Sequence, residues 1–300
     1  MANVNDNTVT ELLASTGATV GTYPVGSEPY AAAFDGGNIW VANFEDDTVT
    51  KISPTSPQAP YISPGGVVPL DSTASTIQPG EWVSIWGNNL ASGTTIWNGN
   101  FPISLGGTSV EINGKAAYLW FVSAGQINLQ APDDTATGTV LVVVTTAGGS
   151  ATSTVTLGQF GPSFSLLDTS HVAGIILRSN GSGAYGGGTY DILGPTGTSL
   201  GYQTVAAKQG DVVELFGVGF GPTSPPVQAG QPFSGAAATT NGVRLVIGVT
   251  SVIPSFAGLV SAGLYQLNVT IPAGLGTGDQ ALVAIVGGVQ TQSGVVISLQ

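Results

Sequence analysis

The fold is decided by a segment that occurs twice, as PGEWVSIWGNNL at residues 79–90 and as QGDVVELFGVGF at residues 209–220. A second pair of segments follows, VSAGQINLQAP at 122–132 and VSAGLYQLNVTIP at 260–272. Gly, Pro, Asn or Asp borders each run of β-branched and aromatic residues, as strands require, and helical periodicity is nearly absent. The chain therefore contains two diverged copies of one strand-rich module.

Each module then ends in two apolar strands around a Gly-rich turn, at 139–144 with 151–157 and at 280–286 with 294–299. Strands that recur about every 8–12 residues fit an immunoglobulin-like sandwich. The sequence thus predicts an all-β chain with one sandwich over 79–158 and another over 209–300. Residues 159–208 are expected to form a β-rich connector between them.

A different repeat begins the chain, since ANVNDNTVT at 2–10 returns as ANFEDDTVT at 42–50. Its offset of 40 residues is typical of one four-stranded propeller blade, so residues 1–53 are expected to form a partial, blade-like β segment. A single blade cannot close a ring and leaves sheet edges unpaired. Either the segment belongs to a longer propeller, or another domain or another copy supplies the missing strands. Residues 54–78 are Pro-rich and are interpreted as a linker.

Two resemblances extend this division. VGSEPYAAAFDGGNIWVAN at 25–43 resembles the YVTN/NHL-type β-propeller repeat. Residues 61–300 resemble the C-terminal region of a family of large secreted proteins of acidobacteria, with TIG/IPT-like immunoglobulin-fold modules. The matching motifs are ISPGGVV at 62–68, LGGTSVEING at 105–114 and GLYQLNV at 263–269. The second resemblance implies export and paired sandwiches, and it indicates no particular activity.

Composition excludes several partners. The 300 residues carry 17 acidic and 5 basic side chains, a net charge of −12, so a phosphate-binding stripe for nucleic acid or an anionic membrane is lacking. No apolar run is long enough for a transmembrane helix, and there is no cysteine. The first residues, MANVND, are not a signal peptide. A cytoplasmic protein is one interpretation. The low-charge, Thr- and Gly-rich composition favours the other, a processed or recloned piece of a protein that is extracellular or at the cell surface.

No credible catalytic set emerges. His171 is the only histidine, with Ser170 beside it and Asp168 three residues back, but adjacency does not define a triad and no G-x-S-x-G elbow accompanies them. Glu81, Glu111 and Glu214 are interpreted as solvent-facing strand residues, not as a glycosidase pair. We therefore predict no catalytic residue and no enzyme.

Two kinds of binding site remain as candidates. Asp6, Asp46 and Asp47 lie in Asn/Asp-rich loops that could bind Ca²⁺, although such residues also initiate β-turns, and no other cofactor is expected. Four tryptophans gather in the first module and could form a glycan platform or a core: Trp82, Trp86, Trp97 and Trp120.

The sequence thus favours a non-catalytic extracellular structural or adhesive protein. One specific form of it is a self-assembling filament or surface-layer subunit that exchanges strands between copies. The alternative is a carbohydrate-binding protein. The predicted partner is accordingly another copy of the chain, or a cell-surface or polysaccharide partner.

Overall fold

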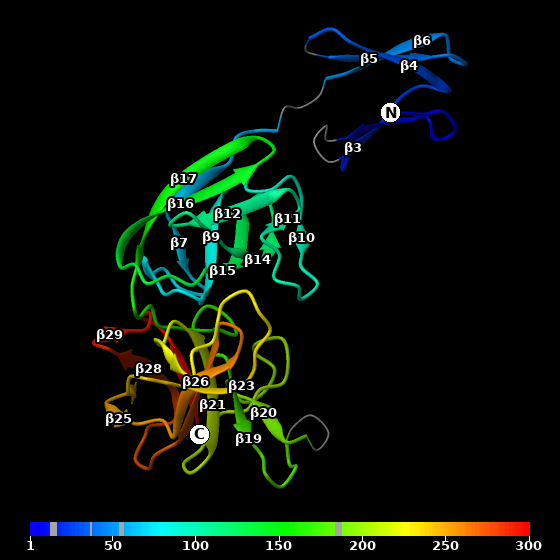
Figure 1. Cartoon of the computed structure of the whole chain (residues 1–300). Coiled ribbons are helices and arrows are strands. Elements are labelled where there is room, and N and C mark those ends of the chain that lie inside the picture. Colours follow the sequence, from blue (N-terminus) through cyan, green and yellow to red (C-terminus); the bar gives the residue numbers. More distant parts are fainter. Residues whose placement is uncertain (13–16, 37, 54–56, 184–187) are drawn as a thin grey trace. The chain divides into compact units, whose positions relative to one another are not determined.

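The protein is built from strands throughout the part of the chain that a computed structural model describes, residues 1–12, 17–36, 38–53, 57–183 and 188–300 (Figure 1). Those ranges contain one short 3-10 turn (Val4–Asp6) and no α-helix, which confirms the all-β prediction. None of the described segments forms a helix that could cross a membrane. The chain divides into two compact units, residues 1–58 and 59–300, which we call unit 1 and unit 2.

Unit 1 holds two three-stranded antiparallel sheets. The first contains β1 (Ala2–Asn3), β2 (Thr8–Leu12) and β3 (Thr19–Pro24), and the second contains β4 (Pro29–Phe34), β5 (Ile39–Asn43) and β6 (Thr48–Ile52). Val9 of the first sheet packs against Val41 and Ile52 of the second. The core of unit 1 therefore lies between the two sheets.

The 40-residue repeat is visible in the hydrogen bonds of unit 1. The Asn3 side-chain amide donates to the hydroxyls of Thr8 and Thr10, at 3.0 and 2.7 Å. Forty residues later, the Asn43 amide donates to the hydroxyls of Thr48 and Thr50, at 3.0 and 2.8 Å. Both sheets thus contain the same Asn–Thr clamp, so residues 40 apart occupy equivalent places.

The first sandwich of unit 2 pairs a five-stranded sheet with a six-stranded one. The five-stranded sheet contains, in spatial order, β10 (Thr95–Ile96), β14 (Tyr118–Val122), β15 (Gln126–Gln130), β9 (Trp82–Asn88) and β7 (Tyr61–Pro69). The facing sheet contains β11 (Ser104–Leu105), β12 (Thr108–Ile112), β16 (Gly138–Thr146), β17 (Gly149–Leu157) and β8 (Thr76–Ile77), with β13 (Lys115–Ala116) on β12. Buried Ile, Leu and Val side chains from both sheets fill the space between them.

The boundary of this sandwich differs from the sequence-based one. The sequence predicts a linker over 54–78, of which 54–56 lie outside the described residues. Strands β7 and β8, however, both fall in this interval and pair within the two sheets. The reason is local: Ile62, Val67 and Ile77 are apolar and buried in the first core, despite the neighbouring prolines and glycines.

The second sandwich is larger because the connector adds strands to it. Its main sheet runs β20 (Tyr190–Ile192), β19 (Gly174–Leu177), β21 (Val212–Val218), β27 (Leu264–Thr270), β26 (Phe256–Ser261), β23 (Ser234–Thr239) and β22 (Thr223–Ser224), with β18 (Ser163–Phe164) on β21. Opposite lie β25 (Thr250–Val252), β24 (Val243–Ile247), β28 (Gly278–Val286) and β29 (Val289–Gln290), with β30 (Val296–Leu299) on β28. Strands β18, β19 and β20 all come from residues 159–208, so the connector is built into the second sandwich.

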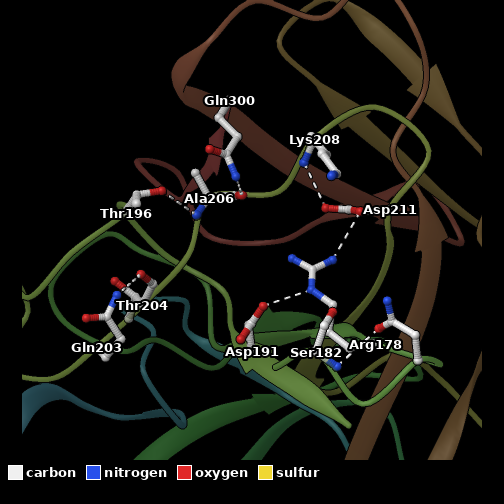
Figure 2. Close-up of polar contacts among 11 residues, drawn as sticks. Arg178, Ser182, Asp191, Thr196, Gln203, Thr204, Ala206, Lys208, Asp211 and Gln300 are labelled. Carbon is white, nitrogen blue, oxygen red and sulfur yellow. Dashed lines mark hydrogen bonds and ion pairs between the residues drawn. The ribbon is translucent and has the colours of Figure 1, made fainter. Parts of the chain in front are cut away.

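An arginine fixes the connector to this sandwich. Figure 2 shows Arg178 between two carboxylates: its Nε donates to Asp191 at 2.8 Å, and its Nη1 donates to Asp211 at 3.1 Å. All three side chains are largely buried. The backbone N–H of Lys208 also donates to Asp211, at 3.0 Å. One guanidinium therefore joins the connector strand β20 to the start of β21.

Replacing Arg178 by Ala should lower the free energy of unfolding by about 2 kcal/mol. That value lies between those of exposed and fully buried ion pairs, and it arises because two shielded carboxylates lose their cation. Urea denaturation would measure it. Arg244→Ala is the matched control, since the Arg244 guanidinium is exposed and makes a long hydrogen bond of 3.5 Å to the Ser251 hydroxyl. Equal losses from the two substitutions would contradict the stabilising role of Arg178 between Asp191 and Asp211.

Candidate functional site

The outer face of the five-stranded sheet is lined by aromatic and amide side chains. Along β9, Val83 and Ile85 point into the core and are fully buried, so Trp82, Ser84 and Trp86 point outward. The neighbouring strand β15 places its polar residues opposite them, Gln126 against Trp86, Asn128 against Ser84 and Gln130 against Trp82. Two adjacent strands thus present one face of aromatic and polar groups.

Hydrogen bonds fix the central amide of this face. The Ser84 hydroxyl donates to Asn128 Oδ1 at 2.9 Å, and Gln126 Nε2 donates to the same oxygen at 2.8 Å. Asn128 is buried and is therefore held in one orientation. Pre-oriented amides of this kind give a binding site its directional contacts.

A groove of about 540 Å³ lies over this face. Trp86 and Trp120 form part of its floor, and Trp86 is 47 % exposed. The opposite wall comes from the segment after β7, from the connector and from the loop before β30, and it includes Asp71, Thr73, Thr169, Gln292 and Ser293.

The opposite wall is tied to the backbone around it. Gln292 Oε1 accepts from the Phe164 N–H at 2.8 Å, and Gln292 Nε2 donates to the Phe164 carbonyl at 2.7 Å and to the Asp71 carbonyl at 3.2 Å. The Asp71 carboxylate accepts from the Leu166 N–H at 3.2 Å, and partial burial raises the pKa of this carboxyl. Both sides of the groove are therefore preformed.

The four tryptophans of the candidate platform separate into two groups. Trp86 and Trp120 line the groove, whereas Trp82 and Trp97 do not. Trp82 packs against Trp97 and Trp120, each at a centroid distance of 5.8 Å, and Phe101 lies 4.6 Å from Trp97. Trp82 and Trp97 thus support the groove from an aromatic cluster beside it.

Sequence reasoning missed the polar half of the groove, although a signal was available. The Gln-x-Asn pattern of Gln126 and Asn128 returns in the second sandwich as Gln266 and Asn268. There Gln266 Nε2 donates to Asn268 Oδ1 at 2.7 Å, and Gln266 lies opposite Phe216, as Gln126 lies opposite Trp86. The repeated motif therefore marks one strand face in both modules.

The acidic loops of unit 1 have turn roles. Within the described ranges, no group of three or more His, Cys, Asp or Glu side chains is placed to hold a metal. Asp46 accepts from the Ser27 N–H at 2.6 Å, and Asp47 occupies the left-handed region with φ 51°. Asp6 ends the 3-10 turn before β2. These are the contacts expected of turn residues.

His171 lies between two carboxylates. Its Nδ1 is 2.8 Å from Asp168 Oδ2, and its Nε2 is 3.3 Å from Asp279 Oδ2. Burial acts to raise the pKa of Asp168, but the N–H groups of His171 and Ser170 and the imidazole outweigh it and lower this pKa to about 2. Because both ring nitrogens face carboxylates, neither is placed to take a proton from the Ser170 hydroxyl.

A second cavity, of about 420 Å³, lies where the two sandwiches meet. Gln78 crosses this junction: its Nε2 donates to the Tyr265 hydroxyl at 3.1 Å, and its Oε1 accepts from the Gly221 N–H at 2.6 Å. Trp82 Nε1 donates to the Ala262 carbonyl at 2.8 Å. The second sandwich thus covers one end of the face that carries the groove.

The same junction buries Glu81. Its side chain is fully buried, and neither carboxyl oxygen has a hydrogen-bond partner in the described part of the chain. Burial raises its pKa well above the usual value of 4.5. The interpretation of Glu81 as a solvent-facing strand residue is therefore wrong, because the loop that contains Gly219 covers it.

Neither a family model nor a curated protein sequence matches the chain. Among solved structures it is similar to SGBP-B of a Bacteroides ovatus mixed-linkage glucan utilization locus, in complex with a mixed-linkage heptasaccharide. The identity is 12 % and the TM-score 0.34, over 98 % of this chain and 64 % of that one, so the chain spans less than two thirds of that protein. SGBP-B from a complex xyloglucan utilization locus in Bacteroides uniformis is 14 % identical, with a TM-score of 0.27 over 96 % and 82 % of the two chains. The plexin A4 extracellular region is 11 % identical, with a TM-score of 0.26 over 80 % and 18 %. At these values the similarities assign no function.

Proposed function

We propose that this chain is a non-catalytic adhesive protein of the extracellular space or cell surface, and that it holds a polysaccharide in the groove over β9 and β15. The observation that carries the proposal is the meeting of two tryptophans, Trp86 and Trp120, with an oriented amide network in one preformed groove. Its volume lies within the range of about 300–1,000 Å³ that is common for ligand sites.

The chemistry of the groove suits a neutral sugar. The C–H face of a pyranose ring can lie on a tryptophan, while its hydroxyl groups can exchange hydrogen bonds with amide and carboxylate groups. Among the described residues that line the groove, Asp71 is the only charged one, and none is Lys or Arg. With a net charge of −12 for the chain, an acidic polysaccharide would meet repulsion. We therefore assign the ligand to neutral polysaccharides.

An adhesive role also agrees with the rest of unit 2. Hydrogen bonds from Trp82 and Gln78 join the two sandwiches across their junction. These contacts hold the sandwich that carries the groove against its neighbour, as a protein that binds without catalysis requires. The low fraction of charged residues, 7 %, is the composition from which we infer an extracellular location.

Trp86→Ala should weaken binding of a soluble neutral polysaccharide by a factor of roughly 30 or more. Removing a central aromatic contact commonly costs at least about 2 kcal/mol of binding free energy. Affinity electrophoresis against a β-glucan, a xylan and a mannan, followed by calorimetry on the best ligand, would measure it. A polyuronate serves as the acidic comparison.

Tyr202→Ala is the matched control, because Tyr202 is an exposed aromatic residue of unit 2 and does not line the groove. Its affinity should equal that of the wild type. The proposal fails if no neutral polysaccharide binds, or if one binds equally well with and without the Trp86 side chain.

A further inference from the structure

Unit 1 exposes an apolar sheet face. On the outer side of the β4–β6 sheet, Trp40 lies opposite Lys51, and Ala42 lies opposite Val49. Lys51 is the only charged group among them, and its ammonium lies 5.5 Å from the Trp40 ring centroid. Apolar faces of this kind mark interaction sites on soluble proteins.

We propose that this face binds a second copy of the chain, head to tail. The outer face of the β4–β6 sheet of one copy stacks on the outer face of the β1–β3 sheet of the next. The contact repeats between molecules the sheet-on-sheet packing that already exists within unit 1, and it is independent of the polysaccharide groove.

The first support is a pair of valines. Val9 and Val49 occupy equivalent places in the 40-residue repeat, as the shared Asn–Thr clamps show. Val9 is 5 % exposed, because its side of the β1–β3 sheet faces the β4–β6 sheet. Val49 is 62 % exposed. The side of the sheet that carries this valine is therefore covered in the β1–β3 sheet and open in the β4–β6 sheet.

The other side of the repeat shows the reverse. Ile52 is 7 % exposed, because it faces the first sheet, whereas the equivalent Leu12 is 44 % exposed. Asn43 is buried, and the equivalent Asn3 is only half-buried. The open side of the first sheet is thus equivalent to the covered side of the second.

These two comparisons identify the occupant. Within unit 1, Val9 is covered by the side of the second sheet that carries Ile52. The equivalent side of the first sheet carries Leu12 and is open, so it can cover Val49 of another copy in the same way. A second copy supplies that surface. Because the two faces differ, the contact is heterologous, so repeated addition gives an open filament or a closed ring. The predicted strand exchange would instead use the edges of the sheets.

The test uses the full chain and two single-face variants, Val49→Glu and Leu12→Glu. Sedimentation velocity over a concentration series should show growing assemblies for the wild type and monomers for each variant alone. A mixture of the two variants should form a complex of two molecules and no larger species, because each variant retains one open face. Val249→Glu, at a position 99 % exposed in unit 2, should assemble like the wild type.

Circular dichroism would show that each variant is folded. A wild type that stays monomeric at its highest soluble concentration would overturn the proposal. So would a Val49→Glu variant that assembles like the wild type, which is the result expected of pairing through strand edges. A mixture that yields no two-molecule complex would also overturn it.

Discussion

The wild-type protein should lose stability steadily as the pH rises above the ordinary glutamate pKa of 4.5, and the Glu81→Gln variant should lose much less. Glu81 is fully buried and burial raises its pKa, so the folded protein keeps this proton at pH values where the unfolded chain has released it. Its contribution to stability is fully present below the unfolded pKa. Above that value unfolding releases a proton, so the free energy of unfolding falls by up to about 1.4 kcal/mol per pH unit until the folded carboxyl also ionises.

The surroundings of Glu81 offer the anion little compensation, because burial outweighs the Gln78 backbone, which acts to lower the pKa of this carboxyl. Tyr265 is the titratable group that faces it across the junction, and burial, followed by the Glu81 charge, raises the pKa of this phenol. The Tyr265 hydroxyl bonds the Gly221 carbonyl and Gln78, so it is directed away from Glu81. Ionising Glu81 would therefore leave a buried charge without a partner, which is one of the more costly events in a protein interior.

Urea denaturation at a series of pH values would measure the slope for wild type and variant. The slope is the informative quantity, since a buried glutamine amide has a cost of its own that does not change with pH. Burial also raises the pKa values of Asp71 and Glu214, so the variant should keep a smaller slope of the same sign. Glu111→Gln, at an exposed position of β12, should reproduce the wild-type profile. Equal slopes for wild type and Glu81→Gln would contradict the assignment.

Glu81 also shows where sequence reasoning reaches its limit. The two sandwiches and the 40-residue repeat could be predicted, because strand alternation and turn residues are local properties of the chain. Whether Trp82 and Trp86 belong to a glycan platform or to a core stayed open from the sequence. What lies over a strand face is not local: the loop around Gly219 covers Glu81, and Gln292 forms the wall opposite Trp86. These partners are distant in the sequence, so no local pattern near Glu81 or Trp86 predicts them.

Gly219→Ala should destabilise unit 2 by about 4 kcal/mol, which is the largest loss that we expect from a single methyl group in this chain. Gly219 has φ 76°, in the left-handed region that costs other residues roughly 1–2 kcal/mol. An added Cβ would also overlap the Gly161 carbonyl and the Glu81 carboxyl. The Gly161 N–H donates to the Gly219 carbonyl at 3.0 Å, so the two backbones cannot separate without losing that bond. Overpacking of this kind adds about 1–3 kcal/mol.

Gly210→Ala separates the two causes. Gly210 has φ 85°, so its backbone strain matches that of Gly219, but no atom lies within 4 Å of the place that its added methyl group would occupy. This control should cost only about 1–2 kcal/mol. Urea denaturation of both variants gives the difference, which measures the close contact of Gly219 with Gly161 of the connector and with Glu81 of the first sandwich. Because the main obstacle is a backbone carbonyl and not the end of a flexible side chain, combining Gly219→Ala with Glu81→Gln should not restore stability. Similar losses for the two alanine variants would mean that the junction can open by a few tenths of an ångström at little cost, and that the buried position of Glu81 depends on something other than this contact.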